Sequence, residues 1–385
     1  MENKKKLLYI VRYPIYEDFN LRGKFDGQLA SFRNLGMDVY HLVFDRKYFY
    51  LVHDGEKRII SRATTSMPVY FHTKVYYDMY RAVRKAADLV DFDYVYWRWA
   101  PAWYSTYYTA RKLHDKGVKI LYEIPTFVKS GEKALNILRK AYFVYSDFLE
   151  EKMAKYLDLF VLIFTGDTTM DTLRGRPVAV IDNGIDVDAI PLRTPQEQED
   201  IHILALASMS YWHGYDRLIR SVHQYAGEKK VVLHMVGGND GGMLPQWQKL
   251  AQELGVEDRV IFHGKMYGEE LNEMFNLCDV GTNALAQYRK NLSATSELKV
   301  REYTARGLPF LCSVTDPALD QAQEPFWLKV ANDDSVPDMR EIVDFALKMR
   351  AQPDHPAAMR AYARKYMTWE SQYGPIFEKL EQADA

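Results

Sequence analysis

The segment 287–309 concentrates side chains that could bind a phosphate. It predicts a polar loop rich in Ser, Thr and Asn, followed by a short helix over 297–306 with Ser296 as its N-cap. The N-terminus of a helix offers unpaired N–H groups and a partial positive charge, and Arg289 and Lys290 lie just before it. This combination predicts an anion site, and a diphosphate is the anion that it would suit.

The same helix has an ordinary interpretation. Glu297 and Arg301 are four residues apart, and so are Glu302 and Arg306. Pairs at this spacing also decorate solvent-exposed helices, where each contributes little. Residue spacing alone therefore leaves both interpretations open.

A histidine follows the first strand of the second half of the chain, in the sequence His213-Gly214. A protonated or hydrogen-donating imidazole could bind an oxyanion there, and a loop histidine that caps the next helix fits equally well. If an oxyanion binds at His213, then Lys299, Arg289 or Lys290 could supply a fixed positive charge beside it.

Polar side chains in the first half occur in a loop and near strand ends. Gly23 and Lys24 lie in a predicted loop that enters a helix. Gly23 would allow a ligand to approach the backbone closely, and Lys24 could face a phosphate or the acceptor. The alternative is an ordinary turn with a surface lysine. Glu123 could orient an acceptor hydroxyl or take its proton, or it could be a structural carboxylate that accepts backbone N–H bonds. Arg98 and Thr126 are candidate acceptor contacts.

The elements that must position these residues alternate between strands and helices. In the first half the predicted strands are 5–11, 37–43, 94–98, 119–123, 157–164 and 178–182, and the predicted helices are 25–35, 73–89, 103–116 and 132–156. After a polar linker at 193–200, the second half repeats the alternation. Its predicted strands are 201–207, 230–236, 259–263, 280–285, 310–314 and 327–330, and its predicted helices are 216–225, 244–254, 268–278, 297–306 and the region after 338.

This alternation predicts an α/β protein with two Rossmann-like domains. We expect an N-terminal domain over 1–190, completed by C-terminal helices at about 363–385, and a C-terminal domain over 191–362. Doubly wound sheets bind ligands beyond the carboxyl ends of their strands, so a ligand is expected in an interdomain groove. The fold alone does not name a reaction.

Composition excludes several classes of protein. The 385 residues carry 50 Lys and Arg against 52 Asp and Glu, without the basic excess that is typical of nucleic-acid binders. Two cysteines, Cys278 and Cys312, are too few for a disulfide scaffold or a structural zinc site. Without an apolar run of about 18 residues, a cytoplasmic protein is expected. The lysines at 4–6 and scattered aromatic residues are also compatible with peripheral contact at the inner membrane face.

An Asp-x-Asp sequence at Asp91 and Asp93 resembles a metal motif, but it precedes a strand and has no other acidic cluster beside it. Hard cations need several converging oxygens. We therefore expect a turn here, and neither a metal nor a cofactor.

The sequence from Glu302 to Pro309 resembles the signature of retaining GT-B glycosyltransferases of family 4 (group 1), many of which make bacterial polysaccharides and glycolipids. The resemblance implies that Glu302 binds the ribose hydroxyls of a nucleotide sugar. The family's first glutamate falls at Ala294, as in a subset with the motif Leu-Lys-x-x-Glu-Tyr, which places Lys299 three residues before Glu302. This departure affects the expected donor-sugar contacts more than the fold.

Weaker matches follow in the family's order. Gly237 and Gly238 resemble its Val-Gly-x-Gly turn, the segment 261–266 resembles a Phe-x-Gly segment that holds the base, and 183–186 resembles its Asn-Gly-Val-Asp. The expected donor-binding residues are therefore Glu302, Lys299, Arg289, Lys290, Ser293, Ala294, Thr295, Gly237, Gly264, Lys265, Gly23 and Lys24. The expected catalytic residues are Glu123, Lys299 and His213.

The resemblance implies a metal-independent transferase that moves a sugar from a nucleotide-diphosphate donor to the hydroxyl of a glycan or lipid-linked acceptor, with retention. Two alternatives remain open: a catalytically weak partner subunit of the same fold, which Ala294 and His213 favour, and a sugar-nucleotide epimerase.

Overall fold

The computed structural model describes residues 4–15, 21–45, 47–63, 71–100, 102–125, 137–164, 166, 170–322 and 326–382, so Thr126 lies outside the described residues. The chain divides into two compact units. Unit 1 consists of Met1–Phe164, Thr168–Ile181 and Gln372–Ala385, and unit 2 of Thr165–Asp167 and Asp182–Ser371. The sequence suggested domain limits at 190 and 363, and the units divide at 181 and 371.

Unit 1 contains a nine-stranded sheet with the order β4-β3-β2-β1-β5-β6-β7-β9-β8. The strands from β2 to β9 in this order pair in parallel, and β3, β4 and β8 are antiparallel additions at the edges. The bounds are β1 (Lys6–Ile10), β2 (Asp38–Phe44), β3 (Tyr48–His53), β4 (Glu56–Arg62), β5 (Tyr94–Arg98), β6 (Lys119–Ile124), β7 (Leu159–Ile163), β8 (Thr172–Leu173) and β9 (Arg176–Ile181).

The β3–β4 hairpin is an element that our sequence prediction missed. Asp54 and Gly55 connect its strands with φ angles of 47° and 83°. Positive φ at both positions is the requirement of the tight hairpin turn that matches strand twist, and Asp-Gly is a favoured pair there. The Asp-Gly pair between two runs rich in strand-forming residues was therefore a usable signal.

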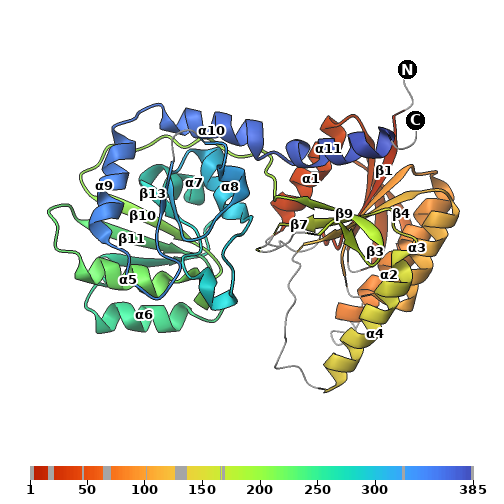
Figure 1. Ribbon diagram of the computed structural model, residues 1–385, viewed down its shortest axis with the longest axis horizontal. Coiled ribbons are helices and arrows are strands. Elements are labelled where there is room, and N and C mark those ends of the chain that lie inside the picture. Colours follow the sequence, from red (N-terminus) through yellow and green to blue (C-terminus); the bar gives the residue numbers. More distant parts are fainter. Residues whose placement is uncertain are drawn as a thin grey trace. The chain divides into compact units, whose positions relative to one another are not determined.

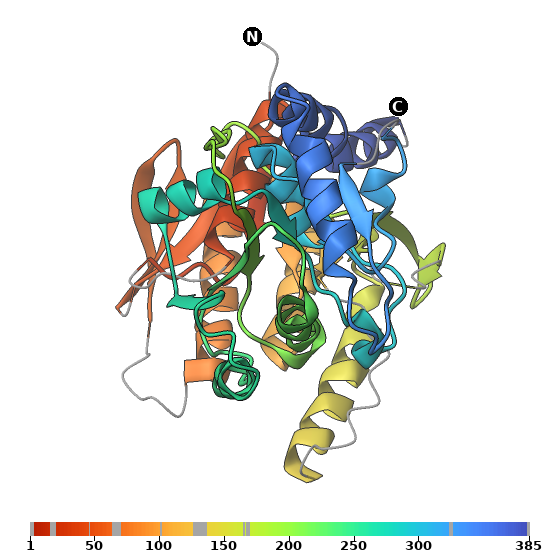
Figure 2. The same cartoon turned by 90° about the vertical axis from the view of Figure 1, so that its left-hand side faces the viewer.

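The helices of unit 1 are α1 (Arg22–Asn34), α2 (Phe71–Leu89), α3 (Tyr104–Asp115), α4 (Ile137–Ala154) and, from Gln372 onward, α11 (Trp369–Gln382). α2 and α3 lie side by side, and α4, yellow in Figure 2, follows α3. α11 lies beside α1 (Figure 1), where the ring of Tyr373 stacks on Phe32 with centroids 4.9 Å apart. The last helix of the chain thus contributes to the core of the unit that contains its first strand.

Unit 2 contains a six-stranded, all-parallel sheet with the order β12-β11-β10-β13-β14-β15. Numbered within the unit, this order is 3-2-1-4-5-6, in which the chain reverses direction across the sheet between β10 and β13. The strands are β10 (Ile201–Leu206), β11 (Val231–Val236), β12 (Val260–Gly264), β13 (Val280–Thr282), β14 (Phe310–Cys312) and β15 (Trp327–Lys329).

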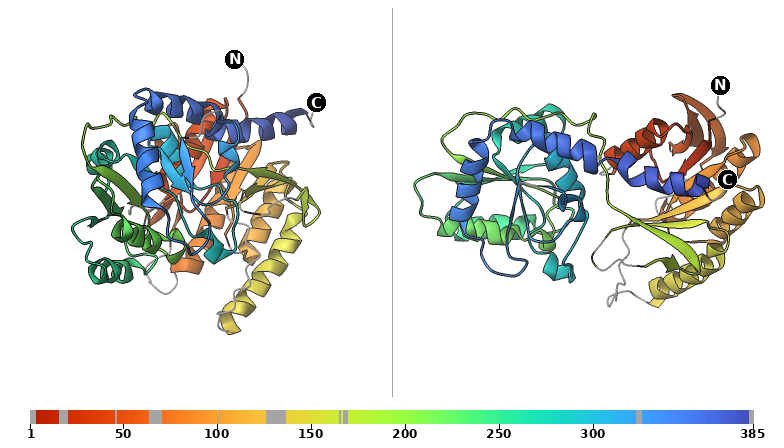
Figure 3. Two further views of the ribbon diagram at one scale, coloured as in Figure 1. Left: turned by 60° about the vertical axis from the view of Figure 1, so that its left-hand side comes forward. Right: turned by 45° about the horizontal axis from the view of Figure 1, so that its top comes forward.

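Helices cover both faces of this sheet (Figures 1 and 3). They are α5 (Tyr215–Gln224), α6 (Leu244–Glu253), α7 (Gly268–Leu277), α8 (Leu298–Arg306), α9 (Met339–Arg350) and α10 (His355–Tyr366). Residues of α5, α6 and α9 share one apolar core, and residues of α7, α8 and α10 share another. Along β10, Ile203 belongs to the first core and Leu204 to the second, as the two-residue period of a strand requires.

Candidate functional site

Two loops meet where the strand order of unit 2 reverses. The loop after β10 contains the short 3₁₀ helix η2 (Tyr211–His213), and the loop after β13 contains η3 (Gln287–Lys290). The N–H of Leu285 donates to the carbonyl of His213 at 2.9 Å. Gly214 has φ 67°, and a Cβ there would lie 2.7 Å from the Cβ of Ala286. A glycine is therefore needed for the two loops to approach this closely.

His213 is a neutral hydrogen-bond donor in this arrangement. Its Nδ1 accepts the N–H of Ser210 at 3.1 Å, so the neutral ring carries its proton on Nε2. Burial, with the positive charges of Lys299 and Lys290, lowers the pKa of His213 to about 2. The protonated form proposed from the sequence is thus disfavoured. α5 has no side-chain cap, so His213 does not cap that helix; its bond to Ser210 instead closes the capping box of η2, and Nε2–H remains as a donor.

Lys299 lies in the first turn of α8, and its Nζ is buried without a hydrogen-bond partner among the described residues. Its neighbours are Glu297 Oε2 at 3.9 Å and the ring of Tyr215, whose centroid is 5.9 Å away. A buried ammonium that lacks acceptors is costly in free energy. A ligand that supplied an oxyanion would remove this cost.

Further buried polar atoms of the same region lack hydrogen-bond partners among the described residues. They belong to the end of β13, the loop that follows it and the start of α5, and are Thr282 Oγ1, Asn283 Oδ1, Gln287 Oε1, Thr295 Oγ1 and the hydroxyl of Tyr215. Native proteins satisfy most such atoms, so a group of them indicates a place where a polar ligand binds.

Glu302 lies on α8, where one carboxylate oxygen, Oε1, accepts the Nε–H of Arg306 at 2.9 Å and the side chain is 26% exposed. The pair expected for a solvent-exposed helix therefore forms here. The second pair does not, because Arg301 is fully buried and its guanidinium binds Asp316 with two hydrogen bonds. The interpretation of α8 as a solvated helix is wrong for that face.

Our prediction of Ser296 as the N-cap is also wrong. Glu297 occupies the N-cap position of α8 and makes no side-chain cap bond. The hydroxyl of Ser296 instead accepts the N–H of Asn183 at 2.7 Å, and Asn183 donates in turn to the carbonyl of Ser296 at 2.5 Å. These bonds fix the loop before α8 to the start of unit 2.

Arg289 and Lys290 differ in their surroundings. The guanidinium of Arg289 binds both carboxylate oxygens of Asp216, at 3.0 and 2.9 Å, and donates to the carbonyl of Tyr211 at 2.6 Å. Arg289 thus joins η3 to the loop after β10. Lys290 is exposed, and its ammonium lies 5.0 Å from the ring centre of Trp212.

The backbone of 292–295 is partly engaged within the protein. Ala294 forms a parallel bridge with Thr315, and the N–H of Thr295 donates to the carbonyl of Thr315 at 2.9 Å. The N–H of Leu292 donates to the carbonyl of Gln287 at 3.1 Å. Of the backbone N–H groups of 292–295, those of Ser293 and Ala294 are the candidates for contact with a ligand.

Gly237 and Gly264 form a second close approach. The N–H of Gly237 donates to the carbonyl of Gly264 at 2.7 Å, and a Cβ on Gly237 would lie 1.7 Å from the carbonyl oxygen of Ala207. Lys265 is exposed and pairs with Asp240 at 3.2 Å.

In unit 1, Glu123 is fully buried and its partners are side chains. Its carboxylate binds Arg98, accepts from Gln28 Nε2 at 2.9 Å and from the hydroxyl of Tyr96 at 2.7 Å, and lies 3.6 Å from the Nζ of Lys24. Burial raises the pKa of Glu123, but Lys24 and Arg98, with the hydrogen bonds, bring it below its usual value. The carboxylate of Glu123 therefore accepts its hydrogen bonds from side chains, whereas we expected a structural carboxylate here to accept them from backbone N–H groups.

Gly23 and Lys24 lie in the first turn of α1, so our prediction of a loop there is wrong. Lys24 is buried, which excludes the surface lysine that the sequence allowed, and burial lowers its pKa to about 8. A Cβ on Gly23 would meet no atom within 4 Å.

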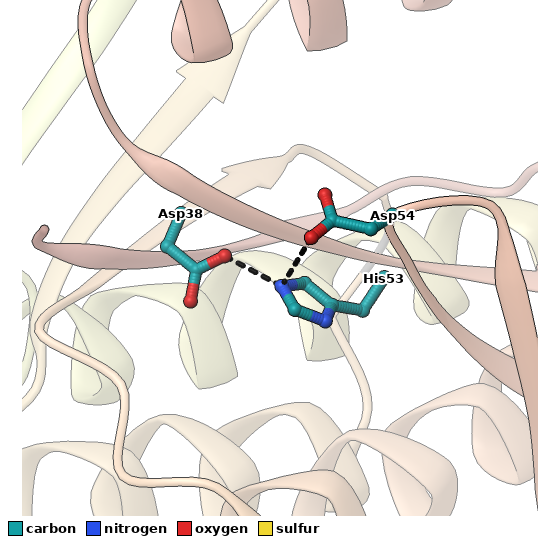
Figure 4. A group of neighbouring side chains, drawn as sticks. All are labelled: Asp38, His53 and Asp54. Atoms are coloured by element: carbon teal, nitrogen blue, oxygen red, sulfur yellow. Dashed lines mark hydrogen bonds and ion pairs between the residues drawn. The ribbon is translucent and has the colours of Figure 1, made fainter.

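One group in unit 1 has the composition of a cation site: Asp38, His53 and Asp54, at the turn of the β3–β4 hairpin (Figure 4). His53 Nε2 lies 2.6 Å from Asp38 and 3.6 Å from Asp54, and the ring stacks on Tyr40. These contacts join β2 to β3, which explains the cluster without an ion. Asp93, of the rejected Asp-x-Asp sequence, accepts the N–H of Lys6 at 2.8 Å before β5.

Comparison with known proteins identifies the fold and a family model that the second half of the chain resembles. Residues 187–366 match the family model described as glycosyl transferases group 1. Comparison with curated proteins gives no match. Among solved structures, sucrose-phosphate synthase from Thermosynechococcus elongatus has a TM-score of 0.65 and 14% identity, covering 99% of this chain and 100% of its own. A glycosyltransferase from Rickettsia africae has a TM-score of 0.64 and 12% identity, covering 99% and 98%.

A third similar structure, Anabaena HepE in complex with UDP-glucose, has a TM-score of 0.60 and 13% identity, covering 98% of this chain and 99% of its own. Among the described residues of the present chain, no helix combines the length and the apolar character needed to cross a membrane. Residues 187–366 are thus similar to the group 1 glycosyltransferases, and the two parallel-sheet units of the chain give it the GT-B fold.

Proposed function

We propose that the protein transfers a sugar from a nucleoside diphosphate donor to a hydroxyl of a glycan or lipid-linked acceptor, with retention, in polysaccharide or glycoconjugate synthesis. The observation that carries the proposal is the buried Nζ of Lys299 in the first turn of α8, which makes no hydrogen bond with any described residue. It lies at the carboxyl edge of a sheet with the 3-2-1-4-5-6 order, where this architecture binds nucleotides. The UDP-glucose complex of Anabaena HepE, which has the same fold, supports a nucleotide sugar as the donor.

The chemistry requires negative charge to be stabilised on the departing diphosphate. Lys299 supplies a fixed positive charge, His213 supplies the Nε2–H donor, and the N-terminus of α8 supplies backbone donors. Lys290 is exposed beside this group and adds a second cation. The proposed reaction therefore draws its electrostatic stabilisation from protein groups, without assigning a step to a metal.

Glu302 is proposed to bind the ribose hydroxyls. Its Oε1 is held by Arg306, which orients the carboxylate while Oε2 remains available as an acceptor. In unit 1 the network around Glu123 suits a positioning role, in which the carboxylate holds Lys24 and Arg98 in place. Arg98 remains the proposed acceptor contact.

The test is nucleotide release over a panel of UDP-, GDP-, ADP- and dTDP-sugars, with and without glucose or disaccharide acceptors, followed by mass spectrometry of the acceptor. Release of one diphosphate together with an acceptor mass increased by one sugar is the expected result, and NMR of the product anomer tests retention. Release without any acceptor product would instead indicate an epimerase or hydrolase. Binding of one donor without release would indicate a partner subunit.

A further inference from the structure

The carboxylate of Glu297 lies beside the proposed phosphate-binding ammonium. Its Oε2 is 3.9 Å from Lys299 Nζ, and both side chains are 18% exposed. Glu297 occupies the N-cap position of α8, yet its side chain makes no cap bond. Capping therefore does not explain the presence of a glutamate at this position.

A buried amide holds this carboxylate in place. Gln287, which is 3% exposed, donates from Nε2 to Glu297 Oε1, while its own Oε1 is buried and makes no hydrogen bond with the residues that the structure describes. Thr295, 5% exposed, has an unpaired hydroxyl in the same loop. An unsatisfied atom on the amide that holds the carboxylate, and another on a nearly fully buried side chain of the same loop, are consistent with a ligand that supplies hydroxyl groups.

Charge determines which part of a nucleotide sugar Glu297 can contact. A carboxylate repels a phosphate but accepts hydrogen bonds from hydroxyl groups, and such charge-assisted bonds are strong. In the donor the sugar is bonded directly to the terminal phosphate, so a group next to the phosphate-binding ammonium lies next to the sugar. The ammonium of Lys299 thus suits the phosphate of the donor, and the carboxylate of Glu297 suits its sugar.

We infer that Glu297, held by Gln287, binds the hydroxyls of the donor sugar and determines which sugar the enzyme accepts; this inference rests on the proposed function. The inference adds a residue that the sequence motif did not assign. It also predicts that the carboxylate opposes binding of a diphosphate that carries no sugar, because it partly neutralises Lys299.

The experiment measures dissociation constants by isothermal titration calorimetry for UDP and UDP-glucose, or for the diphosphate and sugar that the wild-type protein binds in the panel above. Glu297→Gln is expected to weaken binding of the sugar nucleotide about tenfold. Binding of the bare diphosphate should be unchanged or tighter. Glu297→Asp keeps the charge on a shorter side chain and should give an intermediate loss for the sugar nucleotide only.

Glu253→Gln, at an exposed ion pair with Lys249 on α6, is the matched control and should change neither constant. Equal losses for both ligands in Glu297→Gln, or no loss for either, would overturn the inference while leaving the proposed function intact. A wild-type protein that binds no nucleoside diphosphate would instead contradict the proposed function. Circular dichroism of each variant separates a lost contact from a lost fold.

Discussion

At the scale of single residues, the site contains buried polar atoms that have no hydrogen-bond partner in the part of the chain that the structure describes. Arg289 was as good a phosphate ligand as Lys299 by residue type, yet its guanidinium is bound by Asp216 and by the carbonyl of Tyr211. Lys299 has no comparable partner among the described residues. Since a cation that already has its acceptors gains less from a new anion, Lys299 is the stronger candidate.

Replacing Lys299 should therefore weaken ligand binding without lowering the stability of the folded chain. Lys299→Met is expected to weaken binding of the nucleoside diphosphate roughly ten- to a hundredfold, because charge-assisted hydrogen bonds to phosphate are lost. Binding of the bare nucleoside should hardly change. Without ligand the variant should melt close to the wild-type temperature, since removal of a buried ammonium that makes no hydrogen bond with the described residues offsets the lost ion pair with Glu297.

Calorimetry and thermal unfolding provide the two readouts. Lys249→Met, at an exposed lysine on α6, is the control and should alter neither. Equal affinity of Lys299→Met and wild type for the diphosphate would rule out the phosphate role.

At the scale of elements, glycines allow two pairs of loops to approach each other. Gly237 has φ 139°, a backbone conformation that residues with a Cβ rarely adopt, and its Cβ position is occupied by the carbonyl of Ala207. Gly242 also has a positive φ, 79°, but no atom lies within 4 Å of its Cβ position. A side chain at Gly237 would therefore clash with the backbone as well as strain φ, whereas a side chain at Gly242 would only strain φ.

Gly237→Ala is expected to destabilise unit 2 by more than about 3 kcal/mol, because the clash with backbone adds to the conformational cost. Gly242→Ala should cost about 1 kcal/mol, from the conformational cost alone. Urea unfolding followed by tryptophan fluorescence measures both values. Similar losses at the two positions would show that the loop after β11 moves to accommodate a methyl group.

Three neighbouring strands of unit 2 also carry a row of hydrogen-bonded imidazoles. His202 Nδ1 lies 2.8 Å from His234 Nε2, and His234 Nδ1 lies 2.9 Å from His263 Nε2. Burial, followed by the two neighbouring rings, lowers the pKa of His234 to about 3, and burial also lowers the pKa of His202 and of His263. Each ring therefore binds a proton less readily in the folded chain than in the unfolded one.

It follows that the unfolded chain binds more protons than the folded chain below a pH of about 6.5, the ordinary histidine pKa. The contribution of these rings to stability is complete above that pH and is lost progressively as the pH falls toward 3. Glu270 faces His263, and Asp279 and Asp200 face His202; these carboxylates raise the pKa of the two rings and so moderate the effect at the ends of the row. Arg350 and Lys230 also face His202, and their positive charges lower its pKa further.

His234→Gln should therefore flatten the dependence of the unfolding free energy on pH between 4 and 6.5. Chemical unfolding at several pH values measures this slope. His223→Gln, at an exposed histidine of α5, is the control and should preserve the wild-type slope. A wild-type slope in His234→Gln would show that other groups determine the acid sensitivity.

At the scale of the whole molecule, the proposed donor-binding residues fall in unit 2, apart from Gly23 and Lys24 in unit 1. Within unit 2 they come from α8 and the loop after β13, and from the ends of β11 and β12, where Gly237, Gly264 and Lys265 lie. The network of Glu123 in unit 1 depends on α11, because Tyr373 and Glu123 share the side-chain amide of Gln28. The chain therefore completes its first sheet unit only with its last helix.

This arrangement predicts where a bound nucleotide protects the backbone. With a saturating nucleoside diphosphate, hydrogen–deuterium exchange should slow by tenfold or more in the segments 208–214 and 283–299, since ligand contacts restrict local opening. Exchange in the β3–β4 hairpin of unit 1 should not change. Protection confined to unit 1 would contradict the placement of the donor in unit 2.

The sequence by itself determined the order and type of nearly all elements, because hydrophobic periodicity reports which face each segment buries. It also located Glu302 and Lys299 through the residues around Gly307 and Pro309. It missed the β3–β4 hairpin, although Asp54-Gly55 carried the signal, and it placed the start of α1 and the cap of α8 wrongly. Such boundaries depend on a few hydrogen bonds, which periodicity does not report.

Only the tertiary structure decided which charged side chains are already paired. Arg301 and Glu302 are neighbours in sequence, but Arg301 is buried against Asp316 while Glu302 keeps one oxygen available. Spacing along a helix predicts the partner four residues away, whereas Asp316 reaches Arg301 through the turn after β14. Pairing between charges depends on distance and burial in three dimensions, and the residues that compete for a charge come from distant parts of the chain.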